Sequence, residues 1–185
     1  MKKFLQLSQI IGIGLLLVVC LSFIGTNFAK GQSEPGQSEP ARPPREVTLI
    51  GEEDSSILSA VAVPANQAYF WTSGTVPPPS NPDAPEGSSE RYGDTRTQAI
   101  GALERIQDLL QENGLSLEDV IFLRVYLTAD PQMDDQVDFQ GFFNAYEQFF
   151  GTEDTPRVAR STVGVAELVV PEWLIEIEAV AVYPR

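Results

Sequence analysis

The most regular hydrophobic pattern of this chain lies near its end, where apolar and polar residues alternate as they do in β-strands. Residues 158–167 and 173–182 are rich in β-branched side chains, so each segment is expected to be a strand. Because side chains alternate between the two faces of a strand, Glu176 and Glu178 interrupt an otherwise apolar face of the second segment. If the two strands pair, Arg160 of the first can lie on that same face.

Arg160 is therefore the expected partner of the two glutamates, since a carboxylate on an apolar face is costly unless it is paired. Two interpretations of this trio stay open. One is a plain ion pair that sets the register of the strands. The other is a functional site, because buried ion pairs perturb charge states at structural and functional positions alike.

Shorter periodic segments precede these two strands. Further strands are expected at residues 47–50, 57–63, 68–72 and 120–128. The last of them is apolar on both faces, which is typical of a central strand. Residues 94–113 have apolar side chains at helical spacing, and Gly114 follows where a left-handed C-terminal residue belongs. A second helix begins near residue 139, and core packing explains most of its aromatic residues, which are Phe139, Phe142, Phe143, Tyr146, Phe149 and Phe150.

The order of three strands, a helix, a strand, a helix and two strands predicts an α+β domain. We expect a mixed six-stranded sheet with two helices on one face. The opposite face then has no cover, although it carries Val180 and Val182 beside the charged trio. Apolar residues on an uncovered face imply another subunit.

The beginning of the chain has a different character. Lys2 and Lys3 precede an uncharged stretch, so residues 1–29 are expected to be a signal peptide or an uncleaved signal anchor. Residues 30–45 are rich in Pro, Gly and Ser, as linkers are, and the folded domain is expected over residues 46–185. Both interpretations place the domain outside the cytoplasm, periplasmic or secreted. Residues 4–29 are then its one expected contact with a membrane, if they are not cleaved.

Composition and charge exclude several classes of function. The 185 residues contain no histidine, which excludes a Ser-His-Asp or Cys-His centre and most zinc sites. The single cysteine, Cys20, lies in the apolar leader, so the domain has no disulfide and no thiol nucleophile. The formal charge is −14 and all 26 acidic residues follow Lys30. Such a domain repels phosphate backbones, and no nucleic-acid partner is expected.

Two irregular segments remain. Residues 75–92 form a loop longer than most connections, which is typical of a functional loop or an insertion. Residues 130–138 are acidic, but the glycine and the final glutamate of a calcium loop are missing. We therefore interpret these acids as residues near a helix N-terminus and expect no metal site.

Several short motifs occur across residues 47–183. They are Thr72-Ser73-Gly74 after a strand, Gln98-Ala99 in the first helix, Asn113-Gly114-Leu115 beyond it, Ala159-Arg160-Ser161, and Ile175-Glu176-Ile177-Glu178-Ala179. Together they resemble the motifs of the RidA, or YjgF-type, family of reactive-intermediate deaminases. The last two, at this separation, are the most specific.

The resemblance implies a chorismate-mutase-like α+β fold and a homotrimer with three clefts between subunits. It also implies hydrolysis of small enamines and imines, such as 2-aminoacrylate and 2-iminopropanoate, to the 2-keto acid and ammonia. In that family the arginine matching Arg160 binds the substrate carboxylate, and the glutamate matching Glu176 positions or activates water. Main-chain groups at Gly74 help to hold the substrate, and Ser73 and Thr162 are assigned to the same pocket. A guanidinium can make a bidentate contact with a carboxylate, and a carboxylate can orient water for attack on the C=N bond. These residues are sufficient for the reaction, so no cofactor is expected.

The chain departs from the family's pattern at three pocket positions. Ala60 stands where many active members have a tyrosine, Phe143 where they have an asparagine, and Thr162 where a cysteine is frequent. Two functions therefore stay open. The first is an exported hydrolase similar to 2-iminobutanoate/2-iminopropanoate deaminase. The second is a non-catalytic trimeric module that binds a small carboxylate in the cleft of Arg160, or a protein partner on its surface.

Overall fold

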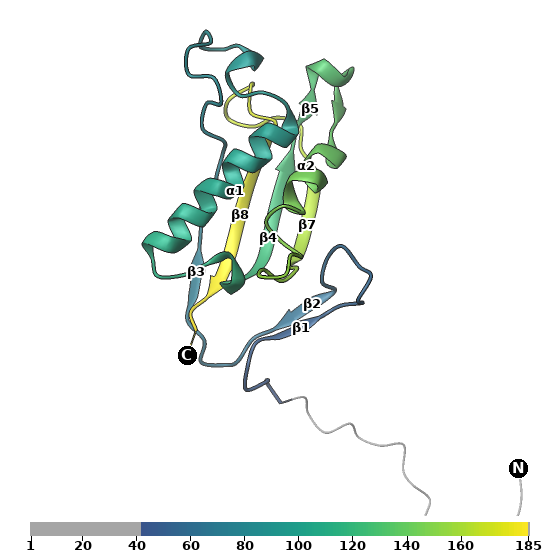
Figure 1. The fold of residues 1–185 in the computed structure, drawn as a ribbon. Coiled ribbons are helices and arrows are strands. Elements are labelled where there is room, and N and C mark those ends of the chain that lie inside the picture. The colour runs from purple at the N-terminus through teal and green to yellow at the C-terminus, as the bar shows by residue number, and fades with distance from the viewer. Residues whose placement is uncertain (1–41, 185) are drawn as a thin grey trace, which may run out of the picture. The chain divides into compact units, whose positions relative to one another are not determined.

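A mixed sheet of four strands forms the centre of the domain, in the order β3-β8-β4-β7 (Figure 1). The strands are β3 (Tyr69–Trp71), β8 (Ile175–Val182), β4 (Val120–Leu127) and β7 (Ala159–Gly164). Strand β8 is antiparallel to β3 and β4, whereas β4 and β7 are parallel. The computed structural model describes residues 42–184, so the expected leader and most of the expected linker lie outside the described residues.

Two helices, α1 (Thr95–Glu112) and α2 (Phe139–Tyr146), cover one face of this sheet (Figure 1). Their apolar sides and the inward side chains of the strands form the main core. Its largest fully buried apolar side chains are Phe142, Phe150, Leu103, Ile106, Leu110, Leu123, Leu127, Ile175 and Ile177. Burying one side chain of this size contributes about 1.5–3 kcal/mol, so the helix-covered face supplies most of the hydrophobic stabilisation.

The ends of both helices follow from local sequence. The Asp94 carboxylate accepts a hydrogen bond of 2.8 Å from the N–H of Thr97, and Asp138 accepts one of 2.8 Å from the N–H of Gly141. Helix α1 ends before Gly114, whose φ of +73° is the left-handed conformation that favours glycine. Asp138 therefore caps α2, in agreement with the expectation for the acidic segment before that helix.

A separate ribbon of two strands, β1 (Thr48–Ile50) and β2 (Ala60–Ala62), lies on the second face of the sheet. The cluster that joins the ribbon to the sheet consists of Val47, Val61, Val63, Ile121, Phe122, Val180 and Val182. Val180 and Val182 are only 7% and 5% exposed as a result.

The remaining elements are short. Strands β5 (Ala129–Asp130) and β6 (Gln136–Val137) pair in a third small sheet. Single turns of 3₁₀ helix are η1 (Ser89–Arg91), η2 (Leu117–Asp119) and η3 (Pro131–Met133). Among residues 42–184, no helix combines the length and the apolar composition that crossing a membrane requires.

The α+β class, the two helices on one face and the order of the main elements are confirmed. The six-stranded sheet and the bare apolar face are wrong. Strands β1 and β2 bond to each other, and one isolated bridge, between Leu58 and Ala159, joins the segment before β2 to β7. Because the chain itself covers Val180 and Val182, these two side chains no longer argue for a partner subunit.

Candidate functional site

Glu176 and Gly74 meet on the second face of the sheet, away from the helices. In strand β8 the side chains of Ile175 and Ile177 are buried in the core. Because side chains alternate along a strand, Glu176 between them points to the other face. A Cβ atom on residue 74 would lie 2.5 Å from Glu176 Cδ and closer still to Oε1. The carboxylate therefore lies directly against the main chain of residue 74, in space that only glycine leaves open.

Ser73 and Gly74 form a β-bulge, in which two residues stand opposite Glu178 alone. Both are exposed, and within the described part of the chain neither main-chain N–H donates a hydrogen bond. They line a pocket of about 350 Å³ together with Trp71 and Arg105. These free N–H groups can bind an anionic or carbonyl group of a ligand.

Arg160 lies on the opposite, helix-covered face, so the expectation that it faces Glu176 and Glu178 is wrong. Strand β4 separates β7 from β8, and the parallel register between β4 and β7 sets Arg160 opposite Leu123, which is fully buried. Residues in register share a face of the sheet. Within one chain, the sheet itself therefore separates Arg160 from both glutamates.

The Arg160 guanidinium packs against the aromatic residues of α2. Its central carbon lies 4.3 Å from the centre of the Tyr146 ring, 5.0 Å from that of Phe143 and 5.1 Å from that of Phe142. Attraction between the cation and the ring faces stabilises this position. The aromatic stripe thus contributes to the core, as expected, and also supports Arg160.

Within the described residues, Nη1 of Arg160 and Oγ1 of Thr162 are among the side-chain atoms that are buried without a hydrogen-bond partner. The residues are two positions apart on β7 and so share a face. Burial lowers the pKa of the Arg160 guanidinium from its ordinary value, while Tyr146 and Glu147 act in the opposite direction. An unsatisfied buried polar group costs about 1–3 kcal/mol, so the pair favours an acceptor from outside the chain.

Arg124, which the sequence interpretation passed over, is the partner of Glu178. The two residues are in register on β4 and β8, and their side chains form an ion pair. A hydrogen bond with Tyr126 and the charge of Glu178 raise the pKa of Arg124. The signal was a single arginine inside an apolar strand, which already needed a neighbour of opposite charge. This ion pair gives Glu178 a structural role.

The five predicted site residues thus fall into two groups. Ser73, Gly74 and Glu176 lie together on the second face, and Arg160 and Thr162 lie together on the helix-covered face. The first group can orient water and bind through main-chain N–H groups. The second can bind a carboxylate. One chain does not bring the two groups together.

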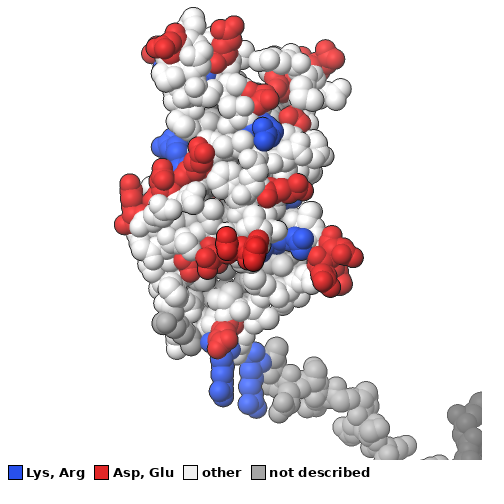
Figure 2. All heavy atoms as spheres, in the orientation of Figure 1, with Lys and Arg blue, Asp and Glu red and all other residues white. Residues whose placement is uncertain are grey.

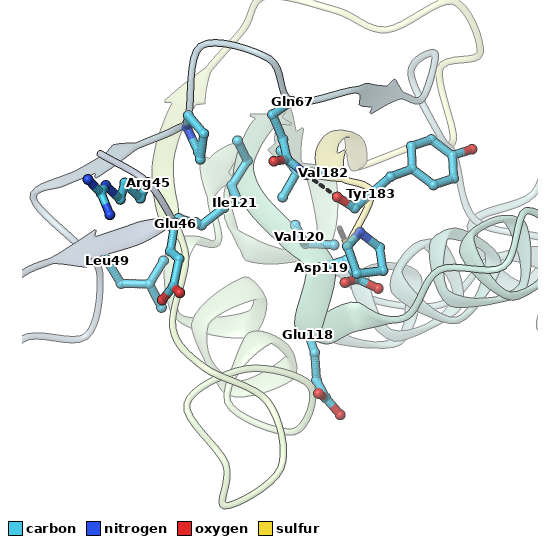
Figure 3. A pocket seen from close by; sticks show the side chains of 13 residues that line it. Arg45, Glu46, Leu49, Gln67, Glu118, Asp119, Val120, Ile121, Val182 and Tyr183 are labelled. Carbon is cyan, nitrogen blue, oxygen red and sulfur yellow. Dashed lines mark hydrogen bonds between the residues drawn. The ribbon is translucent and has the colours of Figure 1, made fainter. Parts of the chain in front are cut away.

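Figure 2 shows how charged side chains are distributed over one face of the molecule. Acidic side chains occur over the whole length of the face in Figure 2, which has no broad basic patch. A pocket of about 330 Å³ lies between the start of β1 and the end of β8, where Gln67 donates a hydrogen bond to the carbonyl of Tyr183 (Figure 3). None of the five predicted site residues lines it. Among residues 42–184 there is no cluster of three acidic side chains able to hold a metal ion.

Comparison with known proteins gives concordant results. The family model described as Endoribonuclease L-PSP matches residues 58–183. The chain is 34% identical over 140 residues to 3-aminoacrylate deaminase RutC of Acinetobacter baylyi, covering 75% of this chain and 98% of that protein. The crystal structure of Escherichia coli TdcF with bound serine matches with a TM-score of 0.50 and 31% identity, covering 66% of this chain and 85% of TdcF. YyfB of Yersinia pestis, a protein of the conserved Rid family, shares the fold with a TM-score of 0.57 at 24% identity, over 75% of this chain and 99% of YyfB.

Proposed function

Since this chain belongs to the RidA, or YjgF-type, family whose model is described as Endoribonuclease L-PSP, we propose that it hydrolyses small enamines and imines to a 2-keto acid and ammonia. The substrates are of the 2-aminoacrylate and 2-iminopropanoate type. The observation that carries the proposal is the pair of buried, unpartnered groups on Arg160 and Thr162, which suit a substrate carboxylate. The relationship to a named 3-aminoacrylate deaminase supports the same reaction class.

The reaction needs little from the protein beyond positioning. The substrate carboxylate accepts hydrogen bonds from the Arg160 guanidinium and the Thr162 hydroxyl. The imine reacts in its protonated form: Glu176 accepts a proton from a water molecule as the water oxygen bonds to the C=N carbon, and the π electrons pass to nitrogen, which gives a neutral carbinolamine. Glu176 then returns the proton to nitrogen, and the C–N bond breaks as the hydroxyl oxygen forms the C=O bond and releases its proton to solvent, so that ammonia and the keto acid leave. An enamine first takes up a proton on carbon and becomes the same protonated imine.

A complete site then requires two copies of the chain. Arg160 of one subunit and the group of Ser73, Gly74 and Glu176 of another lie on faces that one chain cannot bring together. Large apolar side chains exposed on the second face support contact of that face with another subunit, with Trp71 64% and Val163 44% exposed. Our proposal is a homotrimer with three clefts between subunits.

A second candidate function is a binding module without catalysis. The centre of the Phe143 ring lies 5.0 Å from the Arg160 guanidinium carbon, so the ring takes up space beside it. A cleft narrowed in this way retains a carboxylate but has less room for water. In that case the trimer binds a small carboxylate, or binds a protein partner on its surface, and hydrolyses no substrate.

A direct assay separates the two candidates. The domain from residue 46 onward is mixed with the imine formed from alanine by an amino-acid oxidase, and disappearance of the imine is followed with a trapping reagent. If the protein is a catalyst, it should hydrolyse the imine faster than buffer does. The acceleration should be lost in Arg160→Ala and in Glu176→Gln. It should be kept in Arg96→Ala, which is a control at an exposed position of α1. If the protein binds 2-oxobutanoate but does not accelerate hydrolysis of the imine, the binding module is the correct function.

The cellular location completes the proposal. Lys2 and Lys3 before an uncharged stretch, and the polar segment after it, support export of residues 46–185 from the cytoplasm. The domain then acts in the periplasm or outside the cell, anchored through residues 4–29 if these are retained.

A further inference from the structure

We propose that the hydroxyl of Thr72 is a positioning group for Glu176. It acts through the main chain, by building the bulge that brings Gly74 against the Glu176 carboxylate. The inference rests on the proposed function, in which Glu176 handles the attacking water. It adds a residue to which neither the motifs nor the buried polar atoms had assigned a role.

At the end of β3, the side chain of Thr72 replaces its main-chain carbonyl as a hydrogen-bond acceptor. The N–H of Thr72 donates to the carbonyl of Ala179 at 3.0 Å, as a paired residue in an antiparallel ladder does. In a regular ladder the N–H of Ala179 would donate in return to the carbonyl of Thr72. Here it donates to the Thr72 side-chain Oγ1 at 2.9 Å. The side chain therefore occupies the position in the ladder that the main-chain carbonyl normally fills.

Pairing resumes beyond this point with one residue inserted. Thr75 exchanges two hydrogen bonds with Ile177, of 2.8 and 3.0 Å. Between the two paired positions, β8 has one residue, Glu178, while the other segment has Ser73 and Gly74. Because the Thr72 carbonyl is not bound in the ladder, the chain can bend at this point and accommodate the extra residue of the bulge.

The bulge determines where Glu176 lies. Gly74 is the second residue of the bulge, and its Cα surface is in contact with the Glu176 side chain, so a shift of Gly74 opens or closes that contact. A carboxylate without this support can take other rotamers and loses its fixed distance to a bound water. Thr72 touches no substrate in this arrangement and acts only through Gly74.

The test uses the full-length chain with two substitutions at one position. Thr72→Val keeps the shape and removes the acceptor, and Thr72→Ser keeps the acceptor. We expect Thr72→Val to lower kcat about 10- to 100-fold with KM changed less than about twofold, because the carboxylate-binding groups are untouched. Thr72→Ser should stay within about threefold of wild-type kcat. Thr48→Val in the exposed strand β1 is the control and should leave kcat unchanged.

Three results would overturn the inference: wild-type kcat in Thr72→Val, an equal loss in Thr72→Ser, or an equal loss in Thr48→Val. Crystal structures of the two Thr72 variants separate this question from the proposed function. In Thr72→Val the Glu176 side chain should leave Gly74, and in Thr72→Ser it should stay. If wild type hydrolyses no imine, the proposed function fails while the structures still test the role of Thr72. An unmoved Glu176 in Thr72→Val refutes the role in either case.

Discussion

The Arg160 guanidinium lies 4.3 Å from the centre of the Tyr146 ring, yet its Nη1 atom has no hydrogen-bond partner in the described chain. A buried cation supported only by ring faces gains about 0.5–2 kcal/mol from them. An unpaired buried polar group costs about as much. Arg160 thus adds little to the free energy of unfolding. This is unusual for a buried charge and typical of a residue that binds a ligand.

The first prediction follows from this balance. Arg160→Met, which fills the same space against the rings, should change the free energy of unfolding by less than about 1.5 kcal/mol. The affinity for 2-oxobutanoate should fall about 10- to 100-fold, because a charge-assisted contact is lost. Urea unfolding and calorimetry measure the two quantities, with Arg96→Met as an exposed control. A stability loss of several kcal/mol with unchanged affinity would show that Arg160 is structural.

The second prediction concerns the contact between Gly74 and Glu176. Gly74→Ala should reduce imine hydrolysis about 100-fold, because the new Cβ displaces the carboxylate from its position. The matched control is Gly164→Ala, where the nearest atom to a new Cβ is Val137 Cγ2 at 3.5 Å, an ordinary contact. Equal activity of the two variants would mean that the position of Glu176 is unimportant.

The third prediction tests whether the site is shared between subunits. Arg160→Met and Glu176→Gln trimers should each be inactive. After partial denaturation and joint refolding, about a quarter of the wild-type activity should return, because some clefts then combine an intact Arg160 with an intact Glu176. Light scattering should show a trimer throughout. A monodisperse monomer, or no recovered activity from mixed trimers, contradicts the shared site.

The fourth prediction is a pH dependence at the start of α1. Hydrogen bonds from the side chain and main chain of Thr97 lower the pKa of Asp94 from its ordinary value of 3.8. A carboxyl with a depressed folded-state pKa stabilises the fold above the unfolded value and loses that contribution as the pH falls through the folded value. Asp94→Ala should therefore cost about 0.5–2 kcal/mol at pH 7, and the difference should shrink below pH 3.8. Asp108→Ala, at an exposed mid-helix position, should show no such change.

The fifth prediction is the location of the domain. In cells whose outer envelope is opened while the inner membrane stays intact, added protease should degrade residues 46–185. A cytoplasmic marker protein in the same cells should survive as the control. Complete protection of the domain would place it in the cytoplasm and refute export.

Local patterns were sufficient for the elements of this fold. The 3.6-residue period of residues 94–113, with Gly114 behind it, predicted α1 (Thr95–Glu112) to within a residue or two. The two-sided apolar run at 120–128 predicted β4 and its central place in the sheet. These features depend on neighbours a few residues apart, and the sequence alone contains that information.

The partners of charged residues depended on contacts between distant segments. We expected Arg160 to pair with Glu176 and Glu178 because the last two strands were assumed to be neighbours. Strand β4 lies between them, its own Arg124 pairs with Glu178, and the parallel register turns Arg160 to the other face. A shift of register by one residue reverses the face of every side chain in a strand, and the order of the strands decides which side chains become neighbours. The pattern within one strand does not specify that order.

The sequence by itself thus determined the α+β class, the main helices and strands, and the residue types available for chemistry. Tertiary structure alone decided that β1 and β2 cover Val180 and Val182, and that Glu176 rests on Gly74. It also decided that Arg160 and Thr162 lie together on the helix-covered face, where Nη1 and Oγ1 have no hydrogen-bond partner among residues 42–184. The reason is physical: alternation along a strand follows from covalent geometry, whereas the strand that lies beside it is selected by the packing of the whole core.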